Sequence, residues 1–196
     1  MTPTLRTLAS VCLVALASCL VTGCATREER RAEHKETAWA FYEDANYEKA
    51  RVEFLNALKI EATDSEARYG AGLAFRRIAE TDASLPLADR QNLLRTAAGH
   101  LLAAVEQDPT HLEARVEFSD LRLRVFGDVA GARSLAEEAV ALDPRDPDAL
   151  AARAAALQIA GEREQARDDA ERALAIDPSH PRAVAVRAAQ LNGEGR

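Results

Sequence analysis

The chain has 196 residues and a formal net charge of −7, from 32 acidic and 25 basic side chains. This balance argues against nucleic-acid binding and against electrostatic adhesion to anionic lipid, because both need clustered positive charge. Hydrophobic residues make up 47% of the sequence and aromatic residues only 5%, so we expect a core built mainly from alanine and leucine.

The N-terminal segment is typical of an exported protein. Arg6 precedes the apolar run 11–21, which fits the n-region and h-region of a signal peptide and is short for a membrane span. The run ends in Val21-Thr22-Gly23-Cys24, which resembles the bacterial lipobox. That resemblance implies cleavage after residue 23, lipidation of Cys24 and, because Ala25 follows, anchoring to the outer membrane facing the periplasm. The alternative is an ordinary signal peptide with an incidental cysteine.

Cysteine content agrees with this interpretation. Cys12 and Cys19 leave with the signal peptide 1–23, so the mature chain keeps no cysteine pair for a disulfide. Residues 24–30 are predicted to form a lipidated tether, although a solvated helix face explains the charged stretch 26–35 equally well.

Apolar residues recur at helical spacing along the rest of the chain, which predicts an all-α fold. The expected helices cover residues 31–44, 47–60, 65–79, 86–107, 113–125, 129–142, 147–160, 163–176 and 181–191. Ser84 stands where an N-cap is expected, with Pro86 in the first turn of the helix that follows. We expect Leu191 at a core position of the last helix, which closes the stack as a cap.

Three Asp-Pro pairs mark a repeat. Pro109, Pro144 and Pro178 each follow an aspartate at the end of an expected helix, with spacings of 35 (144 − 109) and 34 (178 − 144) residues. A period near 34 indicates stacked helix–turn–helix units, which together form an extended concave surface.

The residues around this period resemble the tetratricopeptide repeat (TPR) family. The best-matched unit carries the motif residues Ala154, Leu157, Ala166, Ala170, Ala173 and Pro178. The resemblance implies a right-handed superhelical TPR solenoid over residues 31–192, with about four helix pairs plus a C-terminal capping helix. The repeats are expected at about 31–64, 65–111 with an insertion near 80–91, 113–146 and 147–180, and the cap at 181–192.

In this family the first helix of each pair lines the concave groove. Alignment to the motif implies exposed groove positions at Lys35, Trp39, Tyr42, Tyr69, Leu73, Arg76, Arg77, Leu121 and Arg124. Aromatic residues beside arginines are enriched at binding hot spots. The alternative is that Trp39 and Tyr42 merely cover the open N-terminal end of the solenoid.

The sequence offers no pattern for catalysis, for a metal or for another cofactor. The four histidines include no i, i+4 pair, and GxSxG and glycine-rich phosphate motifs are absent. His111 and His180 each follow an Asp-Pro pair by two residues, and we expect them in exposed turns. We therefore expect no enzyme, no catalytic residue and no small-molecule substrate.

The resemblance implies a protein partner. The favoured hypothesis is a lipid-anchored periplasmic scaffold or adaptor in the assembly of an envelope machine, such as a pilus, a secretin or exopolysaccharide export. The run Phe54-Leu55-Asn56-Ala57-Leu58, followed by Glu66-Ala67-Arg68, is similar to a TPR lipoprotein linked to exopolysaccharide loci. The alternative is a non-catalytic accessory subunit of a periplasmic cell-wall hydrolase or protease.

Overall fold

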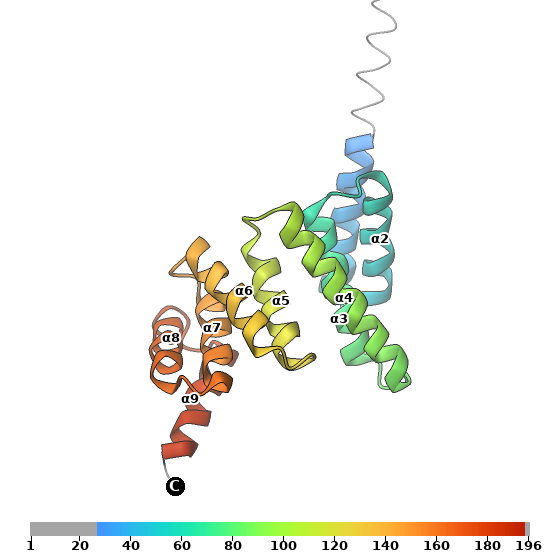
Figure 1. Cartoon of the computed structure of the whole chain (residues 1–196). Coiled ribbons are helices and arrows are strands. Elements are labelled where there is room, and N and C mark those ends of the chain that lie inside the picture. The colour runs from blue at the N-terminus through green and yellow to red at the C-terminus, as the bar shows by residue number, and fades with distance from the viewer. Residues whose placement is uncertain (1–26, 195–196) are drawn as a thin grey trace, which may run out of the picture.

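A computed structural model describes residues 27–194 of the chain, and within that range every regular element is an α-helix (Figure 1). The signal peptide, Cys24 and the start of the predicted tether lie outside the described residues. The first helix covers residues 27–43. It is followed by α2 (Tyr47–Ile60), α3 (Ser65–Thr81), α4 (Leu87–Gln107), α5 (Leu112–Arg124), α6 (Val129–Leu142), α7 (Pro147–Ala160), α8 (Arg163–Ile176) and α9 (Pro181–Glu194).

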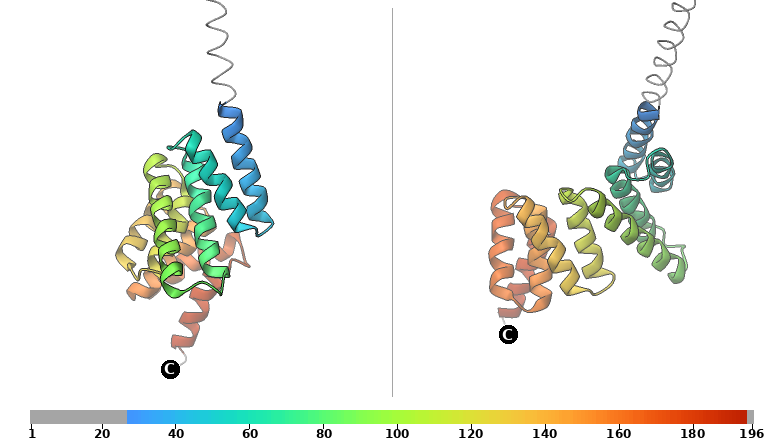
Figure 2. Two further views of the ribbon diagram at one scale, coloured as in Figure 1. Left: turned by 90° about the vertical axis from the view of Figure 1, so that its right-hand side faces the viewer. Right: turned by 45° about the horizontal axis from the view of Figure 1, so that its top comes forward.

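These nine helices of the described region pack in consecutive pairs, as the period predicts, with α9 following the fourth pair. The right-hand view of Figure 2 shows the first helix to α4 on one side and α6 to α9 on the other, with α5 between them. The first helix and α9 lie at opposite ends of the stack (Figure 1). Between residues 27 and 194, no helix combines the length and the apolar character that crossing a membrane requires.

The start of the first helix corrects the predicted tether. Residues 27–30 are helical, so the alternative, a solvated helix face, describes this part of the charged stretch. The Arg27 guanidinium donates to the Ile60 carbonyl oxygen at 2.8 Å, and Arg31 lies 3.4 Å from the Asp64 carboxylate. These contacts hold the first turns of the helix against the end of α2 and the start of α3.

The Asp-Pro pairs build one recurring turn, which explains the period. Asp108, Asp143 and Asp177 each end a helix, and the carboxylate of each accepts a hydrogen bond from the backbone N–H two residues later, at 2.8–2.9 Å. Aspartate favours such local bonds, and proline cannot continue the helix. The same pair of features therefore stops a helix and turns the chain in each of these repeats.

The residue three positions after the aspartate caps the next helix. Asp146 accepts from the Ala149 N–H at 2.7 Å, and the Nδ1 atom of His180 accepts from the Ala183 N–H at 3.3 Å. His111 caps α5 in the same way. The prediction that the two histidines sit in exposed turns is wrong, because capping turns both rings inward, and His180 is only 5% exposed.

The insertion lengthens both helices of the second pair. The second helix, α4, has 21 residues, and α3 continues to Thr81, whereas α2 has 14 residues. Ser84 does not cap α4, contrary to our prediction. Its backbone N–H and its hydroxyl both donate to the Asp82 carboxylate, at 2.9 and 2.6 Å, so the aspartate organises this loop.

Alanine fills the contacts between paired helices. The motif residues Ala154, Ala166, Ala170 and Ala173 have no solvent exposure, and Leu157 is 2% exposed. Side chains this small allow two helices to approach closely. The core of the described region is divided along the stack into four clusters of buried residues instead of one central mass.

The last helix faces the stack differently from our prediction. Leu191 is 59% exposed, whereas Ala183, Val186 and Gln190 are buried. The Gln190 side-chain amide donates to the Gln158 side chain and to the Arg163 carbonyl, both at 3.0 Å. This bonding turns Gln190 toward the α7–α8 turn and leaves Leu191 on the outer side.

Candidate functional site

A hollow of about 400 Å³ opens on the face that the first helix, α3 and α5 share. Its lining consists of Tyr42, Tyr47, Tyr69, Leu73, Arg76, Arg77, Glu80 and Glu117. Five of the nine predicted groove residues line this hollow. Tyr42 comes from the first helix, and the other four come from α3, one repeat later: Tyr69, Leu73, Arg76 and Arg77. The hollow combines aromatic rings, arginine and carboxylate, and it is the candidate binding site.

Aromatic rings form one wall of this hollow. Tyr42 packs edge-on against Tyr47 at 5.2 Å between ring centroids and against Trp39 at 5.7 Å, and Trp39 also approaches Tyr69 at 6.0 Å. Such edge-on geometry is favourable for aromatic pairs. Burial raises the pKa of Tyr42 to about 12, so its hydroxyl is neutral and able to donate a hydrogen bond at neutral pH.

Arg77 is the accessible cation of the hollow, with 43% of its side chain exposed. Its guanidinium stacks on the Tyr47 ring at 5.2 Å and donates to the Tyr47 hydroxyl at 3.1 Å. A second nitrogen donates to Glu80 at 3.3 Å. The tyrosine contacts orient the charge, and the exposed remainder of the guanidinium is available to a ligand.

Arg76, the next residue, has a different environment. Its three nitrogens donate to Glu80 at 2.7 Å, to Glu117 at 2.6 Å and to Asp120 at 2.7 Å, and only 17% of its side chain is exposed. Glu117 and Asp120 belong to α5, so Arg76 joins α3 to α5. Its hydrogen-bonding capacity is used inside the protein, and it supports the hollow more than it offers contacts to a ligand.

The Asp120 carboxylate is the centre of a charged network beside the hollow. It is 3% exposed, and arginines from three helices surround it: Arg76, Arg124 at 2.8 Å and Arg182 at 3.5 Å. Burial raises the pKa of neighbouring Glu117, although Arg76 and Arg182 act in the opposite direction. This network ties α3, α5 and α9 together.

The remaining predicted groove residues have separate environments. Lys35 pairs with Asp64 and Glu66, and the Trp39 indole N–H donates to Glu66 at 3.1 Å. The Trp39 ring also packs on buried Phe54 at 4.9 Å, so its ring contacts lie toward α2 and α3.

Leu121 is wrong as an exposed groove residue. It is fully buried between α4 and α5, in a cluster with Ala97, Leu101 and Phe118. Leu73 is only 8% exposed but lines the hollow, and Arg124 keeps 60% exposure beside Asp120. Leu121 lies four residues after Glu117 on α5, and its packing with Ala97 and Leu101 of α4 buries it.

Sequence reasoning passed over three residues of this site. Tyr47 begins α2, the second helix of its pair, so a groove drawn only from first helices omits it. Asp120 lies three residues after Glu117 and therefore on the same face of α5. Arg182 follows Asp148 by 34 residues (182 − 148), the repeat spacing, so it takes the position in α9 that Asp148 takes in α7.

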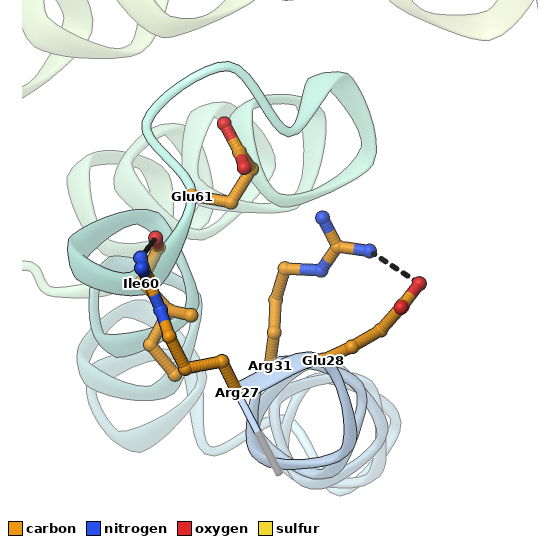
Figure 3. A pocket seen from close by; sticks show the side chains of 5 residues that line it. All are labelled: Arg27, Glu28, Arg31, Ile60 and Glu61. Atoms are coloured by element: carbon orange, nitrogen blue, oxygen red, sulfur yellow. Dashed lines mark hydrogen bonds and ion pairs between the residues drawn. The ribbon is translucent and has the colours of Figure 1, made fainter. Parts of the chain in front are cut away.

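A second hollow, of about 240 Å³, lies where the first helix meets the end of α2 (Figure 3). Arg27, Glu28 and Arg31 line it from the first helix, and Ile60 and Glu61 from α2 and its C-cap. Arg27 bonds the Ile60 carbonyl and Arg31 pairs with Glu28 at 3.5 Å. This hollow is lined by two arginines and two glutamates, so it favours neither an anionic nor a cationic ligand.

No family model and no curated protein matches the sequence. Among solved structures, the crystal structure of MamA protein is similar over 85% of this chain and 84% of that one, with a TM-score of 0.65 and 18% identity. A MamA chain from Desulfovibrio magneticus RS-1 matches over 79% of each chain, at TM-score 0.62 and 16% identity.

A tetratricopeptide repeat protein from Parabacteroides merdae also resembles the chain, at TM-score 0.61 and 16% identity. That match covers 82% of this chain and 58% of the other. At these identities the likeness concerns the fold. The chain has the fold of TPR proteins, an all-α solenoid of consecutive helix pairs.

Proposed function

We propose that this protein is a scaffold or adaptor that binds a segment of a partner protein in the hollow beside Arg77. The observation that supports this function most directly is the grouping of Tyr42, Tyr69, Leu73 and Arg77 around one opening on the solenoid face. Aromatic side chains and arginine contribute disproportionately to protein interfaces. A TPR fold supplies the extended surface on which such a segment lies.

The chemistry of the hollow defines what the segment must offer. Arg77 presents part of a guanidinium, which favours a carboxylate or backbone carbonyl groups as acceptors. The tyrosine rings favour an apolar or aromatic side chain beside that acceptor. We therefore propose a partner segment with an apolar anchor next to an acidic or carbonyl-rich position.

We further propose that the solenoid is exported and lipid-anchored through Cys24, and that its partner belongs to an envelope assembly. The lipobox-like sequence Val21-Thr22-Gly23-Cys24 supports this step. Mass spectrometry of the mature N-terminus tests it directly. A chain that begins at a residue other than Cys24, or that carries no lipid there, contradicts the anchor and leaves the binding proposal to be judged alone.

The binding proposal can be tested with a photo-crosslinking amino acid placed at Glu80 of the full chain in living cells, because Glu80 lines the hollow and Arg77 then stays in place. Arg167 on α8 is the control position, because its side chain is 45% exposed against 36% for Glu80 and 43% for Arg77. We expect one reproducible protein adduct from position 80 and none of the same mass from position 167.

The adduct then defines an affinity measurement. Arg77→Ala should weaken co-purification of that partner by roughly tenfold or more, whereas Arg167→Ala should leave it unchanged. Equal labelling from both positions, or full binding by Arg77→Ala, contradicts the proposal that the hollow is the binding site.

A further inference from the structure

The outer face of α9 is exposed, whereas the face of α7 that corresponds to it by the repeat spacing is covered by another helix. Val184, Ala188 and Leu191 follow Leu150, Ala154 and Leu157 by 34 residues each (184 − 150, 188 − 154, 191 − 157). In α7 those three positions are at most 2% exposed, because α8 packs on them. In α9, Val184 is 45% and Leu191 59% exposed.

This face carries no charge. The solvent-exposed positions of α9 between residues 181 and 192 are Pro181, Val184, Ala185, Ala188, Ala189, Leu191 and Asn192. The only charged side chains in that stretch are arginines on the flanks of the helix. Arg182 lies 3.5 Å from Asp120, and Arg187 lies 3.2 Å from Glu171. In a chain with 29% charged residues, a whole uncharged helix face is unusual.

The other end of the stack is different. The outward side of the first helix exposes Glu29, Glu33, Glu36 and Glu43, which the helical period places along one face. Stacking two copies head to tail would bury these glutamates against the apolar face of α9 without partners, which is costly. The uncharged face of α9 is therefore complementary to α9 of a second copy and not to the first helix of a second copy.

We propose that α9 is the interface of a symmetric dimer, in which the α9 helices of two copies pack on each other in antiparallel orientation. The two-fold axis passes near Ala188, so Val184 of each copy lies against Leu191 of the other. A large–small–large pattern is self-complementary in this arrangement, because the alanines allow close approach where the helices cross. A two-fold interface uses the same patch on both copies.

Ile159, at the end of α7, is a further exposed apolar side chain, with 61% exposure. Its neighbour Gln158 accepts a hydrogen bond from Gln190, the residue before Leu191 in α9. The interface is nonetheless small, since it consists mainly of one helix from each copy. We therefore expect reversible dimerisation with a dissociation constant on the order of micromolar, in the range of small transient interfaces. The inference does not depend on the proposed binding of a partner in the hollow.

Cysteine cross-linking of the full chain tests the dimer. Ala188→Cys places a thiol beside the two-fold axis, and a mild oxidant added to cell membranes makes the result independent of compartment. We expect a disulfide-linked species of twice the chain mass. Ala141→Cys, at an exposed alanine of α6, is the control for random collision and shares the native cysteines.

A second substitution distinguishes a specific α9–α9 interface from random collision of two chains. Leu191→Glu, made in the Ala188→Cys chain, should lower cross-linking at least about tenfold, since both copies then place a charge in the apolar contact. Leu191→Met should retain it. Because Leu191 is exposed in the single chain, the helical content measured by circular dichroism should not change. Cross-linking of Ala188→Cys no stronger than Ala141→Cys, or an adduct to a protein of another mass, overturns the proposal.

Discussion

Replacing Arg76 should loosen the joint between α3 and α5 without changing the shape of any single helix. Arg76 is the only residue of its helix that donates to both Glu117 and Asp120 among the bonds of the described region. Arg77 is an ideal control, because it is the next residue, has the same side chain and bonds only to Glu80 and Tyr47.

The expected cost follows from burial. Removing one partner of a buried ion pair costs roughly 3–5 kcal/mol, because a charge remains without compensation. Asp120 is 3% exposed but keeps Arg124 and Arg182, so we expect Arg76→Ala to lower the free energy of unfolding by about 2–3 kcal/mol. Arg77 makes exposed contacts, for which the cost is about 1 kcal/mol or less.

The effect should also depend on pH. Burial raises the pKa of Glu117, and Arg76 opposes that shift, so its loss raises the pKa further. A carboxyl whose folded pKa is raised stabilises the fold below its unfolded pKa and loses that contribution as the pH rises through the folded value. The penalty of Arg76→Ala should therefore be larger near pH 8 than near pH 5.

Urea denaturation of the two variants, followed by circular dichroism at both pH values, measures these quantities. Equal losses for Arg76→Ala and Arg77→Ala, or a penalty for Arg76→Ala that is larger near pH 5, would refute the role of Arg76 as a buried joint.

Three further changes test other parts of the structure. Ala45 has a φ of 55°, where the third and fourth pairs have Gly127 and Gly161, so Ala45→Gly should stabilise the protein by about 0.5–1 kcal/mol in thermal melts. Burial lowers the pKa of His100 from 6.5 to about 4, so folding should lose about 2 kcal/mol between roughly pH 7.5 and pH 5, as the unfolded chain takes up the proton. His100→Phe should remove most of that pH dependence in denaturant titrations. Ala170→Trp, at a fully buried alanine, should cost about 1–3 kcal/mol or more, and an unchanged melting temperature would contradict the packing of α8 on α7.

The repeat could be predicted because its signals are local. An aspartate that bonds the backbone two residues later and a proline that stops a helix both act within four residues, so Asp143 and Pro144 mark the boundary without tertiary information. Helix pairing followed from alanines such as Ala166 and Ala170, whose spacing defines one face.

The site was harder to predict because it depends on how each helix is rotated. The alignment placed Leu121 in the groove, but Ala97 and Leu101 of the neighbouring α4 pack with it and bury it. Arg76 and Arg77 are adjacent in the sequence, and only the position of α5 makes one a buried joint and the other an exposed contact. Leu191 shows the same limit, since the bonds of Gln190 decide which side of α9 faces inward.

The division of the core into separate clusters means that the molecule does not have to open all at once. In a linear array each helix pair is held only by its neighbours, so the pairs can unfold stepwise from an end. The buried side chains of α9, among them Ala183 and Val186, lie on a single face of that helix, so in the monomer its backbone amides should exchange hydrogen for deuterium fastest. Exchange should slow progressively toward α5 and α3, where ion pairs cross between the units. Local unfolding of the described stack should therefore begin at its C-terminal helix and spread from there.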